Sequence, residues 1–422
     1  MSENRMDWIN EKVIPLINKF MNLKFVKCMQ SAVTAAMPAT IVGSIFMLLM
    51  IPPFAADSTN ALAVAWRAFS AANAGWLNIG YQFGLNAAGF YIVIGMAIAV
   101  CKEDNLPIAN NVVLAVLAFL CLECGFLEGG GVDIGFWGAK GMMAAMIIGF
   151  LVPWFNGWLM NHGVKIKLPE QVPPFPAAPI NAMLANIIVA AAVFAVKLGL
   201  ASMGQTVGTL VNGLFAPLFS GADTIWAVLF YCIFVRILWF FGLHGNNIAG
   251  SVVNPILTVN LVANAEAVMN GGQPTFIFNA AFQNWTTTGI LAIVIAIMIN
   301  AKSEQLKSIS KIAIVPALFN IGEPLTFGLP LVLNFDILLP YLGVFAINGL
   351  VPYLACKMGF MTIPYVSIPF TVPAILKVFL MSMDFRAVIV YLVNMVLSIL
   401  IITPAIRKYD RKLLAQERGE AE

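Results

Sequence analysis

Charged residues are scarce in this chain of 422 residues, because only 10% are Asp, Glu, Lys or Arg. A soluble globular domain carries about 25% charged residues, so these are too few to cover a water-facing surface. Hydrophobic residues make up 60% of the sequence, and the mean hydropathy is +0.89. We therefore expect lipid to be the solvent. The formal net charge of +3 is too small to suggest a nucleic-acid partner.

The sequence also lacks the short motifs of common catalytic and metal sites. It contains no phosphate-binding loop, dinucleotide fingerprint, Ser-His-Asp series or His-Glu-x-x-His zinc motif. Its six cysteines lie in or beside apolar runs, where cysteine packs as a small hydrophobe. Cys121 and Cys124 have the spacing of a metal or redox pair, but no second Cys/His pair follows. We expect no metal and no cofactor.

We expect no cleavable signal peptide in residues 1–25, because their charges are mixed and they contain no long apolar run. Their apolar residues recur at helical spacing, which predicts an amphipathic helix on the membrane surface. The alternative is an amphipathic helix that docks on protein. The apolar positions are Trp8, Ile9, Val13, Ile14, Ile17, Phe20 and Met21.

A membrane-spanning helix needs about 20 apolar residues, and ten segments qualify or come close. Two further apolar segments, 311–329 and 361–380, are rich in proline, which removes a backbone donor and kinks a helix. We interpret both as re-entrant hairpins. The fold class is therefore an all-α polytopic membrane protein. The ten predicted spans are 30–50, 77–100, 108–127, 139–159, 180–202, 223–241, 251–263, 286–301, 330–352 and 385–404.

The basic residues gather beside particular spans. With ten spans, every basic cluster falls on one side of the membrane, which the positive-inside rule makes the cytoplasm. The termini are then cytoplasmic. The clusters are Lys24 with Lys27, Lys165 with Lys167, Lys302 with Lys307 and Lys311, and the tail with Arg407, Lys408, Arg411, Lys412 and Arg418.

A glycine-rich stretch, 203–222, divides the spans into two sets of five and includes a possible interfacial helix. We expect a scaffold domain over 26–202 and a substrate-binding domain over 223–404. The N-terminal helix (1–25) and a basic cytoplasmic tail (405–422) complete the division.

Two polar stretches interrupt the second half, Leu243–Asn247 and Asn320–Pro324. Hydrocarbon tolerates such stretches only where protein or a wet cavity surrounds them, and an ionisable group at membrane depth suggests function. The imidazole of His244 and the amides of Asn246 and Asn247 offer donors and acceptors without a fixed charge. With the ring of Trp239 nearby, they suit a neutral polyhydroxyl solute. The alternative is a helix-breaking loop with a satisfied histidine.

Glu323 could accept hydrogen bonds from two hydroxyl groups at once, each worth about 1.5–3 kcal/mol. Alternatively, it merely pairs with His244 or with Arg236, which lies in the sixth predicted span. Asp336 could pair with a cation or be a protonated core acid. Gln82 and Asn86, near the second span, could also reach the pocket.

Residues 239–247 (WFFGLHGNN) and 320–328 (NIGEPLTFG) resemble the signatures of the membrane EIIC component, or permease, of the bacterial sugar phosphotransferase system. The nearest branch is that of the lactose, cellobiose and diacetylchitobiose permeases. The similarity covers nearly the whole chain, and the two motifs together are specific. The family often has Trp in a Pro-Trp-Thr-x-Pro stretch where this chain has Phe370, which leaves the identity of the sugar open.

The resemblance implies a homodimer whose first five spans form the interface and whose second half carries a β-linked disaccharide across the membrane. A phosphocysteine on a separate EIIB chain, itself served by EIIA, would phosphorylate the sugar's 6-hydroxyl. Glu323 and His244 would be the catalytic residues beside that hydroxyl. Asn246, Asn247, Trp239, Asn320 and Phe370 would complete the sugar site.

Two other functions are open to a membrane protein with these residues. A proton-coupled secondary sugar transporter could use Glu323, His244 and Asp336 as a proton relay. An intramembrane enzyme, such as a lipid-sugar transferase, is disfavoured because the sequence offers no metal-binding acid pair and no nucleophile.

Overall fold

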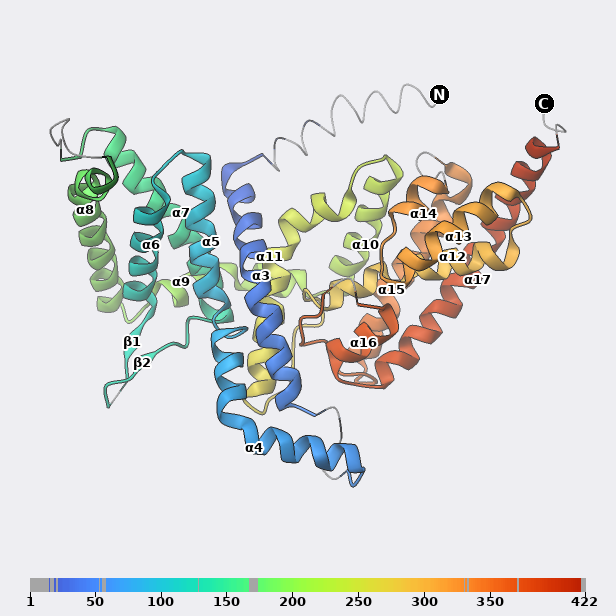
Figure 1. The fold of residues 1–422 in the computed structure, drawn as a ribbon, viewed down its shortest axis with the longest axis horizontal. Helices are drawn as coiled ribbons and strands as arrows, with labels where there is room; N and C mark the ends of the chain where they lie inside the picture. Colours follow the sequence, from blue (N-terminus) through green and yellow to red (C-terminus); the bar gives the residue numbers. More distant parts are fainter. Residues whose placement is uncertain are drawn as a thin grey trace. The chain divides into compact units, whose positions relative to one another are not determined.

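The computed structural model describes residues 15, 19, 22–52, 54, 58–127, 129–166, 174–329, 331, 334–369 and 372–418. Most of the predicted N-terminal surface helix therefore lies outside the described residues, as do Lys167 and Phe370. The described chain is helical apart from loops and one short antiparallel hairpin, in which β1 (Gly125–Phe126) pairs with β2 (Val132–Asp133) (Figure 1). The predicted all-α membrane fold is confirmed.

Eight helical stretches in the described part of the chain are long and apolar enough to cross a membrane. Two shorter apolar helices, α6 (Ile108–Glu123) and α10 (Ile225–Phe240), bring the set to the ten places predicted from the sequence. The eight stretches are Lys24–Met50, Ala61–Glu103, Ala139–Asn161, Ile180–Ser202, Gly245–Met269, Phe282–Asn300, Phe335–Lys357 and Arg386–Glu417. The prediction 251–263 was too short, because helix α11 includes the polar residues from Gly245 onward.

The chain divides into two compact units. The first comprises residues up to Phe46 and Asn78–Leu218, and the second comprises Met47–Leu77 and Phe219–Glu422. The first unit contains most of α3 (Lys24–Met50), the end of α4 (Ala61–Phe83), α5 (Ala88–Glu103), α6, the hairpin, α7 (Ala139–Asn161), α8 (Pro174–Ser202) and most of α9 (Val207–Ala222). Helices α5, α6 and α7 pack against one another, and Gly149 of α7 lies against Val93 and Met96 of α5.

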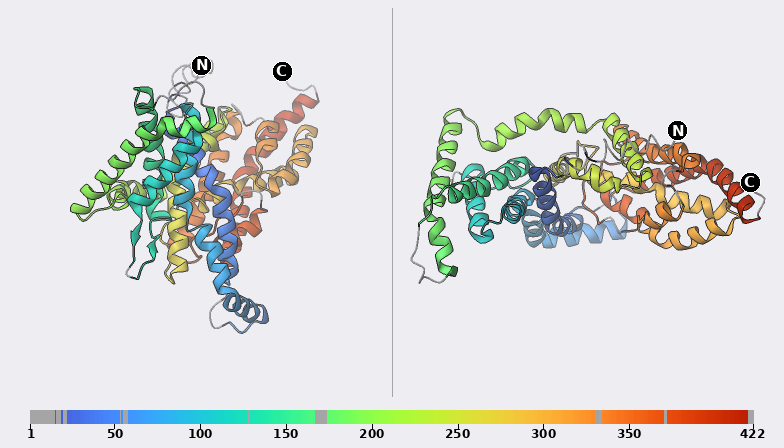
Figure 2. Two further views of the ribbon diagram at one scale, coloured as in Figure 1. Left: turned by 60° about the vertical axis from the view of Figure 1, so that its left-hand side comes forward. Right: turned by 90° about the horizontal axis from the view of Figure 1, so that it is seen from above.

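The second unit contains α10, α11 (Gly245–Met269), the 3-10 helix η2 (Phe282–Thr287), α12 (Gly289–Asn300), α13 (Glu304–Leu318), α14 (Glu323–Gly328), α15 (Phe335–Lys357), α16 (Ala374–Ser382) and α17 (Arg386–Glu417). Helices α12, α13 and α17 lie together in both views of Figure 2. Two apolar clusters form the core of this unit, one around Trp285 and Phe278 and the other around Phe345 and Ile293.

Both segments predicted as re-entrant contain a break. Helix α13 ends at Leu318 and the short α14 begins at Glu323, so residues 319–322 turn the chain within the segment 311–329. In the segment 361–380, irregular backbone precedes α16. Buried amides hold that backbone: Asn279 Nδ2 and Asn264 Nδ2 donate to the carbonyl of Pro364 at 2.8 and 3.2 Å.

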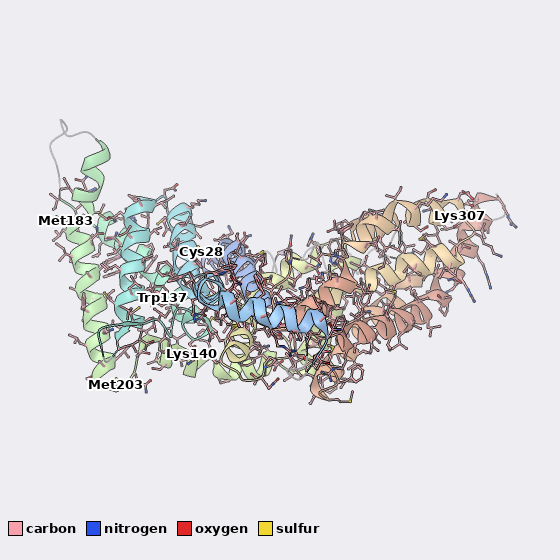
Figure 3. The ribbon with its side chains drawn as sticks, turned by 60° about the horizontal axis from the view of Figure 1, so that its bottom comes forward. Cys28, Trp137, Lys140, Met183, Met203 and Lys307 are labelled. Carbon is pink, nitrogen blue, oxygen red and sulfur yellow. The ribbon has the colours of Figure 1, made fainter. Side chains whose placement is uncertain are left out.

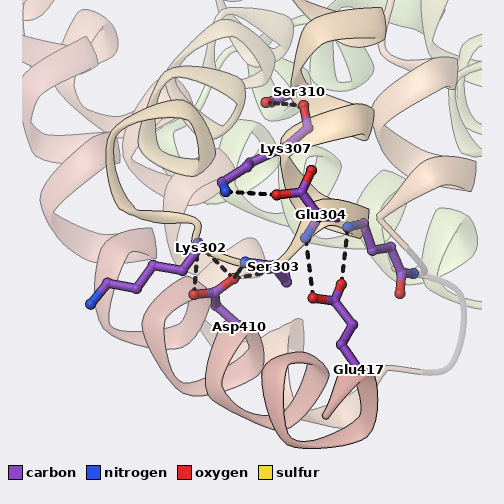
Figure 4. A network of polar contacts seen from close by, with 8 residues as sticks. Lys302, Ser303, Glu304, Lys307, Ser310, Asp410 and Glu417 are labelled. Carbon is purple, nitrogen blue, oxygen red and sulfur yellow. Dashed lines mark hydrogen bonds and ion pairs between the residues drawn. The ribbon is translucent and has the colours of Figure 1, made fainter.

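The buried carboxylate of Asp410 in α17 fixes the start of α13 (Figure 4). Its Oδ1 accepts hydrogen bonds from the Lys302 and Ser303 amides at 3.0 and 2.9 Å, and from Ser303 Oγ at 2.7 Å. These donors lie at a helix N-terminus, where the first amides have no partner within the helix. The exposed carboxylate of Glu417 binds the next two amides in the same way.

Asp384, between α16 and α17, anchors the loop that leads into the second broken segment. It accepts a hydrogen bond from the Thr362 amide at 2.8 Å and pairs with the Arg386 guanidinium at 2.9 Å. Burial alone would raise the pKa of Asp384, but the bonds from Arg386 and Thr362 outweigh burial and hold the pKa below its usual value. A carboxyl with a depressed folded-state pKa stabilises the fold above its unfolded pKa, near 3.9.

We therefore expect the fold to lose part of its stability as the pH falls below about 4, since Asp384 must then take up a proton. Replacing Asp384 with Asn should lower the free energy of unfolding by about 1–2 kcal/mol at neutral pH and flatten this acid dependence. Thermal unfolding of both proteins between pH 3 and 7 checks the result. An unchanged pH profile in the variant would show that Asp384 is not the titrating group.

Candidate functional site

The first polar stretch forms the turn between α10 and α11. Gly242 has φ +75°. Its amide donates a hydrogen bond to the Trp239 carbonyl at 3.0 Å, and the Leu243 amide donates one to the Leu238 carbonyl at 2.9 Å. This hydrogen-bond pair is the Schellman ending of a helix, which favours glycine at the left-handed position. The turn delivers His244 to the N-cap of α11.

The second polar stretch repeats this design with asparagine in place of glycine. Asn320 has φ +63°, a left-handed conformation that asparagine tolerates better than most residues. The Asn320 amide bonds the Ala317 carbonyl, and the Ile321 amide bonds the Pro316 carbonyl, both at 3.0 Å. Helix α14 then begins at Glu323, with a proline at its second position.

The two stretches meet in the second unit, although their key residues are far apart in sequence. His244 Nε2 lies 3.9 Å from Glu323 Oε1, and the two side chains are 44% and 48% exposed. A half-exposed pair at this distance is a weak ion pair at best. Both groups therefore keep free hydrogen-bonding capacity for a third molecule.

The orientation of the imidazole follows from its second nitrogen. His244 Nδ1 accepts a hydrogen bond from the Asn247 amide at 3.3 Å. In the neutral ring the proton is then on Nε2, the nitrogen that faces Glu323. The Trp239 ring lies against the imidazole, with centroids 4.5 Å apart, and helps to fix its position.

The remaining predicted residues are spread around this pair. Asn246 and Asn320 are half-buried, and Asn247 is exposed on the first turn of α11. Trp239 is only 5% exposed, so its ring supports His244 more than it offers an open surface. Phe370 lies outside the described residues.

The side chain of Asn320 links the two broken segments. Its Nδ2 donates to the Val372 carbonyl at 3.0 Å, two residues before α16 begins. The turn that carries Glu323 is thus tied to the backbone entering α16, and this bond restricts where the Glu323 carboxylate can lie.

The suggested pairing of Arg236 with Glu323 is wrong in this conformation. Buried Arg236 donates to the Thr286 carbonyl at 3.1 Å, and its guanidinium lies 3.6 Å from the centroid of the Phe345 ring. Asp336 takes the first of its two suggested roles, because it pairs with the ammonium groups of Lys408 and Lys412 at 3.1 and 2.6 Å.

Sequence reasoning missed Lys377, a fully buried side chain in α16 whose Nζ donates to Asn284 Oδ1 at 3.2 Å. The signal was a single lysine in the apolar run Ala374–Ser382, within a segment already expected to break. In the other unit, Asn86 Nδ2 donates to Gln82 Oε1 at 2.6 Å. The described residues include no group of three or more His, Cys, Asp or Glu side chains placed to hold a metal ion.

Comparison with known proteins assigns these features to a family. Residues 30–344 match the family described as "Phosphotransferase system, EIIC". The chain is 29% identical to the oligo-beta-mannoside-specific EIIC component of Bacillus subtilis, over 98% of this chain and 96% of that protein. It is 28% identical to the lactose-specific EIICB component of Lacticaseibacillus casei, over 99% of this chain and 73% of that longer protein.

A solved structure has the same fold. The crystal structure of the transporter ChbC, the IIC component of the N,N'-diacetylchitobiose-specific phosphotransferase system, superposes with a TM-score of 0.87. That alignment covers 98% of this chain and 100% of the other, at 26% identity. With its multi-pass membrane fold and the match over residues 30–344, the chain belongs to the EIIC family of sugar permeases of the phosphotransferase system.

Proposed function

We propose that this protein carries a neutral β-linked oligosaccharide, such as a disaccharide, across the bacterial cytoplasmic membrane and presents its 6-hydroxyl for phosphorylation. The observation that carries the proposal is the meeting of His244 and Glu323 at 3.9 Å, both half exposed. The relatives' names support the substrate class, since they specify oligo-beta-mannoside, lactose and cellobiose.

The chemistry of the pair suits a hydroxyl group. The Glu323 carboxylate accepts hydrogen bonds from one or two sugar hydroxyls, and a bond to a charged acceptor is roughly twice as strong as a neutral one. His244 Nε2–H donates to a sugar oxygen nearby. Neither group requires the substrate to carry charge, so the pair favours a neutral sugar over an ionic solute. Asn246, Asn247 and Asn320 supply further polar contacts, and Phe370 an aromatic surface.

Phosphoryl transfer then needs little more from this chain than position and a proton acceptor. The sugar 6-hydroxyl oxygen attacks the phosphorus of phosphocysteine on EIIB. A P–O bond forms, the S–P bond breaks, and the thiolate leaves on EIIB. The hydroxyl proton passes to the Glu323 carboxylate. The product is a dianion that the sugar site binds poorly, which traps it in the cytoplasm.

The assembly follows from the same proposal. EIIB and EIIA are partner proteins, and the name of the lactose-specific EIICB relative supports an EIIB partner. Two copies of this chain pair through the domain 26–202, and the domain 223–404 holds the sugar and moves it as a body. Both termini face the cytoplasm, with the basic tail beyond residue 404.

Reconstituted vesicles test the function. With a β-linked disaccharide outside and phosphorylated EIIB inside, we expect sugar phosphate to accumulate in the lumen. Vesicles with unphosphorylated EIIB should accumulate none. Uptake of unmodified sugar driven by a pH gradient alone would contradict the proposal and favour proton coupling.

A further inference from the structure

The first unit contains a second site, unrelated to His244 and Glu323. A cavity of about 200 Å³ is lined by residues from the end of α6, the β1–β2 hairpin and the connection from α8 to α9. Figure 1 labels these elements. Its lining carries charges of both signs. The polar side chains that line it are Glu123, Asp133, Lys197, Gln205 and Thr206.

Glu123 has an unmet hydrogen-bonding requirement. The residue is 4% exposed, and its Oε2 accepts a bond from the Gly208 amide at 3.2 Å. Its Oε1 is buried and has no hydrogen-bond partner among the described residues. Buried carboxylate oxygens normally accept a hydrogen bond, so an oxygen without one requires an explanation. One explanation is that a bound ligand supplies the donor.

Lys197 of α8 holds a positive charge at the edge of the same cavity. Its Nζ donates to the carbonyls of Cys121 and Cys124 at 2.5 and 2.9 Å, at the end of α6. These two bonds fix the ammonium group in place, and an ammonium has a third proton to donate.

An apolar groove of about 580 Å³ adjoins the cavity and shares Cys124, Gly125 and Lys197 with it. Trp137, labelled in Figure 3, and Phe194 line the groove together with Leu120, Val132 and Ile134. The polar cavity, which is lined by Glu123 and Lys197, therefore adjoins the apolar groove, and Lys197 lies where the two meet. This combination matches an amphiphile rather than a sugar or an ion.

We propose that this is a binding site for one phospholipid with a primary-ammonium headgroup. Its ammonium lies beside Glu123 and donates to the orphan Oε1, its phosphate lies beside Lys197, and an acyl chain occupies the groove. A trimethylammonium headgroup has no N–H to donate, and a glycerol headgroup brings no positive charge. Both should therefore bind less well, although their acyl chains are the same.

The test uses the purified full-length protein and three lipids with identical acyl chains: phosphatidylethanolamine, phosphatidylcholine and phosphatidylglycerol. Binding is measured by native mass spectrometry and by the lipid-induced rise in unfolding temperature. We expect phosphatidylethanolamine to bind about tenfold more tightly than either other lipid, because one charge-assisted hydrogen bond contributes about that factor.

Glu123→Gln keeps an acceptor for the Gly208 amide and should abolish this preference without abolishing binding. Glu304→Gln, at an exposed carboxylate paired with Lys307, is the matched control and should retain the preference. Equal binding of the three lipids to the unmodified protein would overturn the proposal, even if Glu123→Gln failed to fold. A preference that survives Glu123→Gln would also overturn it.

Discussion

Replacing Glu323 with Gln is expected to weaken disaccharide binding by about 10- to 100-fold. The carboxylate can accept two hydroxyl hydrogen bonds worth about 1.5–3 kcal/mol each, and each 1.4 kcal/mol is a factor of ten in affinity. Gln keeps one carbonyl acceptor but replaces the other oxygen with a donor. Calorimetric titration of the purified protein with a β-linked disaccharide measures the change.

The same variant should fold normally, because Glu323 is 48% exposed and its contact with His244, at 3.9 Å, is weak. An unfolding temperature near that of the unmodified protein would establish this. Glu304→Gln, in the helix that precedes the site, is the control and should bind sugar with unchanged affinity. If Glu323→Gln binds the disaccharide as tightly as the unmodified protein does, the Glu323 carboxylate is not part of the sugar site.

The second large loss of transport is expected on replacing Asn320. This residue adopts a left-handed backbone conformation and also donates a side-chain hydrogen bond, and substitutions can separate these two properties. Asn320→Asp keeps a residue that tolerates φ +63° but loses the donor to the Val372 carbonyl, and it places a carboxylate against that carbonyl. Loss of the link should free the turn that carries Glu323. We expect up to about a tenfold fall in transport, since the hydrogen bond contributes at most about 1.5 kcal/mol.

Two companion variants show which property matters. Asn320→Gly satisfies the left-handed backbone but removes the link, and Asn320→Ala removes both. If the hydrogen bond from Asn320 to the Val372 carbonyl positions Glu323, both variants should bind sugar less tightly. Asn320→Ala should also have a lower unfolding temperature. Full transport activity in Asn320→Gly would mean that the backbone conformation alone suffices.

The fold was predictable from the sequence because lipid imposes a simple rule on each span. A run of about 20 apolar residues marks a spanning helix, whatever its partners are. Even α6 and α10, which are only 16 residues each, lie at predicted places. The breaks at 319–322 and before α16 were also predictable, since proline and glycine act locally.

Polar residues that hydrocarbon does not tolerate marked both stretches, and the resemblance to the EIIC family predicted that His244 and Glu323 lie beside one sugar hydroxyl. Other contacts carried no such signal. Asp410 reaches the backbone of Lys302 and Ser303 across 108 and 107 positions, and backbone amides leave no trace in a sequence. For Arg236 the sequence suggests a carboxylate partner, Glu323, and this prediction is wrong. The guanidinium instead donates to a backbone carbonyl and lies over an aromatic ring.

The most direct test measures whether His244 and Glu323 act on one sugar together. Disaccharide affinity is titrated for the unmodified protein, His244→Ala, Glu323→Gln and the double variant. If both side chains hold the same hydroxyl region 3.9 Å apart, the double variant should lose less affinity than the sum of the single losses, by about 1 kcal/mol or more. Strictly additive losses, or a single variant with unchanged affinity, would contradict a shared sugar site.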